Sequence, residues 1–226
     1  MARLKVGVLI SGRGSNLAAL LDAAGAPGCP YEIVHVVSNV AGAAGLDIAG
    51  SHGVTTTVID HRGFADRAGF DAALDRALRA AGVEFVCLAG FMRLLGDGLV
   101  AGWRDRMVNI HPSLLPAFKG RHPQRQALRA GARESGCTVH YVRPAMDSGP
   151  IVARAKVPVL AGDDEATLSA RILAAEHRLY PLALALIATG DIGVEGERAR
   201  RSAAADAALG PLENPLNPPS FLAATL

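Results

Sequence analysis

Segment 109–116, with the sequence Asn-Ile-His-Pro-Ser-Leu-Leu-Pro, contains the residue types best suited to catalysis. If Asn109 and His111 lie on a strand, their side chains point to the same side, because strand side chains alternate with a period of two. Pro112 would end that strand and hold His111 at its edge. The carboxamide can donate to a developing oxyanion, and the imidazole can transfer a proton at neutral pH. The pair indicates acyl chemistry.

A catalytic histidine needs a group that orients its ring. Asp147, in the later loop Met-Asp-Ser-Gly-Pro, is the best-placed candidate for His111. The residues alone leave an alternative open, in which His111 is a strand-end histidine bonded to a backbone carbonyl.

A second candidate site is the loop that contains Gly12, Gly14, Ser15 and Asn16. It follows an apolar run and precedes a helix-forming segment, so its N–H groups and the Ser15 hydroxyl suit one phosphate. It is not a full dinucleotide fingerprint, because Leu17 replaces the third glycine. A tight turn capped by Ser15 or Asn16 is the alternative.

The third segment, 88–95, leaves an apolar run through Phe, Met and two Leu residues. It suits a pocket for a flat heterocycle, although composition alone favours core packing. Two other chemistries are disfavoured: Ser15 lacks the second glycine of a hydrolase nucleophile elbow, and no paired spacing joins His111, His122 and His140 as metal ligands. We expect no metal.

Short apolar runs alternate with helix-forming segments through the first 110 residues, which predicts βαβ units and a mostly parallel sheet flanked by helices. Strands are expected at 6–10, 33–37, 55–59, 83–88 and 107–110, with helices beginning near 17, 43 and 66. The three candidate segments follow strands, and ligands of open α/β sheets gather at the carboxyl ends of strands.

The C-terminal third has a different pattern. Segments 138–142 and 151–157 predict an antiparallel strand pair, and a long helix over 165–187 follows, capped by Asp163 or Asp164. We expect one domain over 1–190 and a peripheral tail over 191–226.

The composition limits the class of protein. The chain has 226 residues, of which 50% are hydrophobic and 19% charged, which suits a globular domain without disulfides. Its 23 basic and 21 acidic residues give a net charge of +2, which argues against a nucleic-acid partner. The three cysteines lack a CxxC pattern, and we find no membrane-spanning run or signal peptide. We expect a cytoplasmic protein with small-molecule partners, free cysteines in or near the core and no membrane partner.

Taken together, these motifs resemble the phosphoribosylglycinamide formyltransferases, the folate-dependent enzymes of purine biosynthesis. The resemblance extends from residue 5 to about 190 and keeps the family's order of motifs. The matching segments are 8–17, 88–95, 109–116, 139–140, 147–151, 155–159 and 176–181.

The resemblance implies a Rossmann-like formyltransferase fold and transfer of formyl from the cosubstrate 10-formyltetrahydrofolate to the amine of glycinamide ribonucleotide, without a metal. It assigns catalysis to Asn109, His111 and Asp147. It assigns the ribonucleotide to Gly14, Ser15 and Asn16 at the phosphate and Glu176 at the glycinamide end. The folate contacts that it implies are Arg67, Met92, Arg93, Leu94, Leu95 and Asn109. It also implies a cis bond between Leu115 and Pro116 and is compatible with a homodimer.

Three positions depart from the family pattern. Arg13 occupies a variable loop position, Leu173 stands where some relatives carry a polar residue, and Arg154 lies where a glutamine-containing stretch is more usual. The related methionyl-tRNA formyltransferase would need a basic C-terminal domain, whereas only a short tail follows the long helix here. Formyltetrahydrofolate deformylase, a hydrolase, and a non-catalytic nucleotide-binding protein remain as alternatives.

Overall fold

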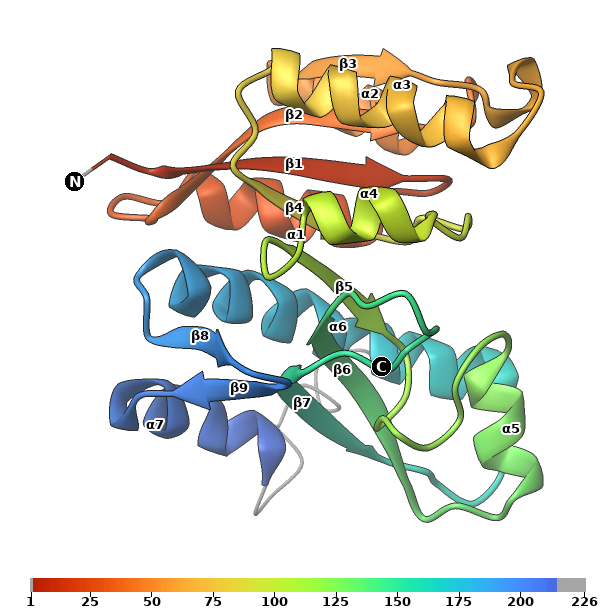
Figure 1. The fold of residues 1–226 in the computed structure, drawn as a ribbon. Helices are drawn as coiled ribbons and strands as arrows, with labels where there is room; N and C mark the ends of the chain where they lie inside the picture. The colour runs from red at the N-terminus through yellow and green to blue at the C-terminus, as the bar shows by residue number, and fades with distance from the viewer. Residues whose placement is uncertain (1, 215–226) are drawn as a thin grey trace.

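The computed structural model describes residues 2–214, and within them seven strands form one sheet in the order β3-β2-β1-β4-β5-β6-β7 (Figure 1). Neighbouring strands from β3 through β5 pair in parallel, whereas β6 and β7 are antiparallel. The predicted parallel sheet with an antiparallel pair is therefore confirmed. The strands are β1 (Leu4–Ile10), β2 (Tyr31–Ser38), β3 (Thr55–Val58), β4 (Phe85–Leu88), β5 (Met107–His111), β6 (Glu134–Tyr141) and β7 (Ile151–Pro158).

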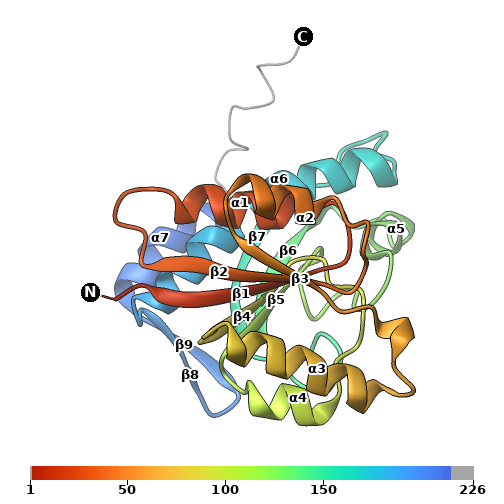
Figure 2. The same ribbon diagram turned by 90° about the horizontal axis from the view of Figure 1, so that it is seen from above.

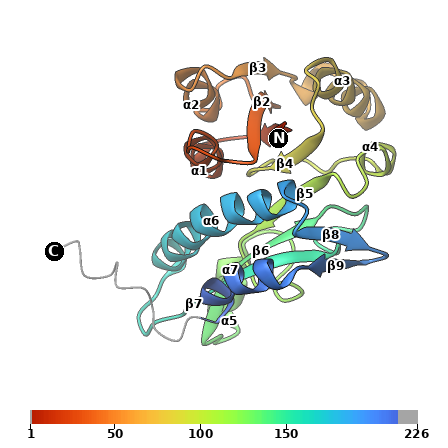
Figure 3. The same ribbon diagram turned by 90° about the vertical axis from the view of Figure 1, so that its left-hand side faces the viewer.

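Helices cover both faces of the sheet, as Figures 2 and 3 show. One face carries α1 (Ser15–Ala24), α2 (Gly45–Ser51) and α6 (Glu165–Ala188), and the other carries α3 (Arg67–Ala80) and α4 (Asp97–Gly102). Each face has its own apolar cluster, so β1 buries side chains on both sides. This two-sided burial explains why its sequence is a continuous apolar run rather than an alternating one.

Within residues 2–190, two short helices and one turn lie outside the predicted elements. They are α4, α5 (Pro123–Arg129) and the 3₁₀ turn η1 (His61–Gly63). In α4 the six residues Asp-Gly-Leu-Val-Ala-Gly include two glycines, which weaken any helical signal. Tertiary packing of Leu99 and Val100 compensates for this low propensity.

The strand order places a topological switch between β1 and β4. The chain adds β2 and β3 on one side of β1, then crosses to form β4 on the other side. Crevices at the carboxyl ends of such strands are the usual ligand sites of open α/β sheets. The glycine loop after β1 and segment 88–95 after β4 therefore meet at this point.

Helix α6 is fixed at its start and near its middle. Asp164 caps it through a capping box with Thr167, which confirms one of the two predicted caps. The buried Tyr180 hydroxyl donates to the backbone oxygens of Leu88 and Val108, at 3.1 and 3.3 Å. These bonds hold α6 across β4 and β5, and Glu176 lies one helical turn before Tyr180.

The segment after α6 folds against the main domain. It contains a hairpin of β8 (Ile192–Glu195) and β9 (Arg198–Arg201), followed by α7 (Ala203–Glu213). Leu209 and Leu212 of α7 join the larger apolar cluster. The expected peripheral tail is thus structured as far as the structure describes it, and residues 215–226 lie outside the described residues.

Two smaller predictions are confirmed. The Leu115–Pro116 peptide bond is cis. All three cysteines are unpaired, with Cys87 and Cys137 buried and Cys29 half-buried.

Candidate active site

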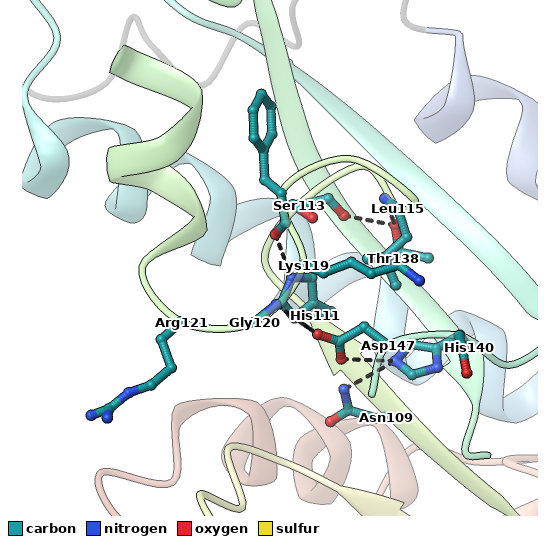
Figure 4. A network of polar contacts seen from close by, with 12 residues as sticks. Asn109, His111, Ser113, Leu115, Lys119, Gly120, Arg121, Thr138, His140 and Asp147 are labelled. Atoms are coloured by element: carbon teal, nitrogen blue, oxygen red, sulfur yellow. Dashed lines mark hydrogen bonds and ion pairs between the residues drawn. The ribbon is translucent and has the colours of Figure 1, made fainter. Parts of the chain in front are cut away.

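His111 lies at the end of β5 and is enclosed by two acceptor groups (Figure 4). Its Nδ1 lies 3.6 Å from Asp147 Oδ2, and its Nε2 lies 3.0 Å from the backbone oxygen of Phe118. A neutral imidazole has one N–H, whereas the imidazolium has two and can donate to both acceptors. The structure therefore combines the two interpretations of this histidine, because it has both an orienting carboxylate and a backbone carbonyl partner.

Asp147 lies between two histidines. Its Oδ1 is 3.8 Å from His140 Nε2, and its Oδ2 accepts from the backbone N–H of Gly120 at 2.9 Å. Its backbone has a φ of 50°, a left-handed conformation that aspartate tolerates better than most residues. Non-glycine residues in this region carry strain and gather at functional sites. The three polar neighbours hold the carboxylate in one position, and the backbone strain is typical of a functional site.

Asn109 contacts a partner that sequence reasoning had not assigned to the site. Its Nδ2 lies 3.1 Å from His140 Nε2, and His140 Nδ1 lies 3.0 Å from the backbone oxygen of Tyr141. Burial lowers the pKa of His140, so its ring is neutral at pH 7. With its proton on Nδ1, the ring accepts from Asn109 at Nε2. The carboxamide is thereby oriented with its nitrogen toward His140.

The role of His140 follows from the antiparallel pairing of β5 and β6. In this register Asn109 faces His140 and His111 faces Thr138. The sequence predicts the two strands but not their register, so it does not predict the contact between Asn109 and His140.

The glycine loop brings together the four residues assigned to the ribonucleotide. Gly14 has a φ of 77° and lies so close to α2 that a Cβ there would be 2.5 Å from Gly45 Cα. Ser15 begins α1, and Asn16 Nδ2 donates to Glu176 Oε2 of α6 at 2.7 Å. Arg13 is exposed beside them.

Glu176 is buried, and burial raises its pKa to about 7 despite the opposing hydrogen bond from Asn16. The Asn16 side-chain oxygen is also buried, without a hydrogen-bond partner among the described residues. This end of the site therefore holds a carboxyl group that changes charge near neutral pH and an acceptor that remains free for a ligand. Leu173 is half-buried on the same helix.

Segment 88–95 is partly core, as composition alone favours, because Leu88 and Ala89 at its start are buried. Met92 and Leu94 are 83% and 53% exposed, whereas Leu95 and Phe91 pack on the smaller apolar cluster. The backbone N–H of Met92 donates to Ser11 Oγ at 2.8 Å, which joins this segment to the end of β1. Exposed apolar side chains beside the switch point are what a pocket for a flat ligand requires.

The two arginines assigned to the folate lie around this segment. Arg93 has its guanidinium 5.5 Å above the Phe70 ring, and its buried Nε lacks a hydrogen-bond partner among the described residues. Arg67 begins α3 and lines a cavity of about 550 Å³ with Asp71 and Gly96. The structure thus places Arg67 next to the end of segment 92–95, on the α3 and α4 side.

Residues 2–214 contain no group of three or more His, Cys, Asp or Glu side chains arranged to hold a metal ion. None of the helices in this part of the chain has both the length and the apolarity of a membrane span.

The fold and this constellation define a class of protein: the chain belongs to the formyl transferase family, whose model matches residues 4–184. The match includes Asn109, His111, Asp147 and Glu176.

Two individual relatives carry names more specific than that of the family. The chain is 41% identical over 187 residues to "Phosphoribosylglycinamide formyltransferase" of Escherichia coli, covering 83% of this chain and 88% of that protein. It is similar to the crystal structure of glycinamide ribonucleotide transformylase 1 from Symbiobacterium toebii, with 47% identity, a TM-score of 0.86 and coverage of 88% of this chain and 94% of that chain.

The chain also resembles part of much longer proteins. It is 55% identical over 190 residues to the "Trifunctional purine biosynthetic protein adenosine-3" of Drosophila pseudoobscura pseudoobscura. That alignment covers 83% of this chain and 14% of the relative, so the chain spans about a seventh of its length.

Proposed function

We propose that the protein transfers the formyl group of 10-formyltetrahydrofolate to the amine of N1-(5-phospho-D-ribosyl)glycinamide. The products would be formylglycinamide ribonucleotide and tetrahydrofolate, a step of de novo purine biosynthesis. One observation carries this proposal: Asn109, His111 and Asp147 converge at the end of β5 in a chain of the formyl transferase family. The names of the E. coli and S. toebii relatives support the choice of acceptor. We place the reaction in the cytoplasm.

In the proposed reaction, the substrate amine attacks the formyl carbon and negative charge develops on the formyl oxygen. Asn109 Nδ2 and a protonated His111 would donate to that oxygen, each contributing about 3 kcal/mol if they act like other oxyanion donors. The new C–N bond forms to the glycinamide amine, and the bond from carbon to the folate nitrogen breaks. The protonated His111 would give its proton to the leaving folate nitrogen, and the neutral ring would then take up the proton lost by the amine.

Asp147 and Phe118 would control the His111 ring in this step. Asp147 faces Nδ1 at 3.6 Å and would orient the ring through that nitrogen. Nε2 contacts the Phe118 carbonyl, so a substrate atom reaches this nitrogen only by competing with that carbonyl. The Phe118 carbonyl thereby keeps the ring oriented before substrate arrives.

The binding residues follow the same proposal. Gly14, Ser15 and Asn16 would hold the phosphate at the start of α1, and Glu176 would contact the glycinamide end. Met92, Arg93, Leu94 and Leu95 would hold the pterin, with Arg67 as a second folate contact and Asn109 at the formyl group.

A spectrophotometric assay of formyl release tests the proposal. Purified protein is given 10-formyltetrahydrofolate with and without glycinamide ribonucleotide, and formylated product is measured. Turnover that depends on the ribonucleotide supports the transferase. Release of formate without acceptor would replace it with the deformylase, and inactivity with retained ribonucleotide binding would favour a binding protein.

A further inference from the structure

A row of three residues crosses the C-terminal half of the sheet. His111 on β5 faces Thr138 on β6, and Thr138 faces Arg154 on β7. Side chains at facing positions of antiparallel strands point to the same side of the sheet. All three point toward the segment from Pro112 to Gly120, which is named here the site loop.

Each member of the row is bonded to the site loop. His111 Nε2 contacts the Phe118 oxygen. Thr138 Oγ1 donates to the Ser113 oxygen at 2.7 Å and accepts from the Leu115 N–H at 3.0 Å. Arg154 donates twice to the Leu115 oxygen, from Nε at 3.0 Å and from Nη2 at 2.7 Å. Leu115 is thus held at both its N–H and its carbonyl.

Arg154 is itself anchored by the C-terminal helix. Its backbone N–H donates to Glu213 Oε1 at 3.1 Å, and Arg201 donates to both oxygens of Glu213, at 2.7 and 3.0 Å. Burial alone would raise the pKa of Glu213, but these donors lower it below the ordinary value. Glu213 is therefore ionised at neutral pH and ties β7 to α7, outside the segment 4–184 that matches the family.

We propose that Arg154 is a positioning residue for the active site, which sets the place of the site loop through the Leu115 carbonyl. Its kinetic consequence rests on the proposed function. The Phe118 carbonyl, three residues farther along, orients the ring of His111, so displacement of Leu115 moves the partner of the histidine. Arginine suits this role because its planar fork can place two donors on one oxygen, which neither lysine nor glutamine can do.

Hydrogen–deuterium exchange tests the hold on the loop without any assay of activity. Arg154→Gln should speed amide exchange in peptides that cover 113–120 by about ten- to a hundredfold, the range expected for losing hydrogen bonds from a charged donor. Arg154→Lys keeps the charge and should give a smaller increase. The matched control is Arg201→Gln, which breaks the contact with Glu213 but leaves both donors on Leu115.

Kinetics then test the consequence for catalysis. Arg154→Gln should lower kcat by about tenfold or more, as ångström-scale displacements of catalytic groups do, with KM for both substrates nearly unchanged. Arg154→Lys should recover part of the loss. Arg201→Gln should lower the melting temperature while kcat and loop exchange stay close to the parent.

Three outcomes would overturn the inference. Unchanged loop exchange in Arg154→Gln would mean that Arg154 does not hold the loop. Faster exchange with parental kcat would mean that the hold has no catalytic role. Equal effects of Arg201→Gln and Arg154→Gln would mean that both variants act only by destabilising the fold as a whole. If the parent itself transfers no formyl group, the proposed function fails, while exchange still decides whether Arg154 holds the loop.

Discussion

The glycine loop and the site loop both belong to the proposed active site but are held in place by different means. The glycine loop is fixed by backbone packing, because Gly14 leaves no room for a Cβ beside Gly45. The site loop is fixed by side chains from three strands, and its Phe118 adopts a φ of 55° without being glycine. In this structure the proposed anion site is fixed by close backbone packing, whereas the proposed proton-transferring group is held by polar contacts.

The largest expected effect is on catalysis at His111, which lies beside the site loop. His111→Ala should lower kcat by about a hundredfold or more, because it removes a general acid–base group, while ribonucleotide affinity stays nearly intact. Steady-state kinetics and calorimetric titration with glycinamide ribonucleotide measure the two quantities. Loss of affinity at unchanged kcat would instead place His111 with the binding residues.

The next effect concerns the carboxyl group that anchors the glycine loop. The pKa of Glu176 is raised from 4.5 to about 7 in the folded protein. Between these values the folded state keeps a proton that the unfolded state has lost, so the free energy of unfolding falls as pH rises through this window and levels above it. The penalty above pH 7 is on the order of 3 kcal/mol.

Glu176→Gln removes this titration and should be more stable than the parent above pH 7, with little difference near pH 4.5. Urea unfolding of both proteins at several pH values measures the difference. Parallel curves across the whole range would show that Glu176 does not titrate in this window.

A smaller effect tests the steric basis of the glycine loop. Gly14→Ala places a Cβ 2.5 Å from Gly45 Cα at a left-handed φ, so the loop must shift. We expect a loss of about 1–3 kcal/mol in unfolding free energy together with weaker ribonucleotide binding. Gly12→Ala is the matched control, since a Cβ there meets nothing within 4 Å. If both variants behave alike, close packing is not what fixes the loop.

The smallest effect on stability is expected at the exposed apolar side chains of the folate segment. Met92 is 83% exposed, so Met92→Ser should change the free energy of unfolding by less than about 0.5 kcal/mol. Its KM for 10-formyltetrahydrofolate should nevertheless rise several-fold, because the variant loses apolar contact with the pterin. A parental KM would remove Met92 from the folate site.

Features that depend on local spacing could be predicted from the sequence, whereas contacts between distant segments could not. Asn109 and His111 are two residues apart on one strand, so their common face follows from strand periodicity. Contacts that depend on strand register, such as those of His140 and Arg154, do not follow from any local pattern. The bond between Asn16 and Glu176 joins residues far apart in the chain, and only the family resemblance indicated that both belong to one site.

The elements that were missed have a similar cause. Helix α7 is Ala-rich and interrupted by Gly210 and Pro211, so the apolar spacing of Ala205, Leu209 and Leu212 gives only a weak helical signal. Strand β9 reads Arg-Ala-Arg-Arg and has no apolar alternation. Their stability comes from packing on β7 and from the contact between Glu213 and Arg201. Such tertiary stabilisation is invisible in a window of a few residues.

The long sequence separation between Asn16 and Glu176 also has a consequence for synthesis of the chain. The two residues are 160 positions apart, so a ribosome adding roughly 5–20 residues per second makes them roughly 8–32 seconds apart. During that interval the nascent chain carries the glycine loop without the carboxyl group that anchors it. The proposed ribonucleotide end of the site is therefore completed late in translation, after the seven strands of the main sheet have been made.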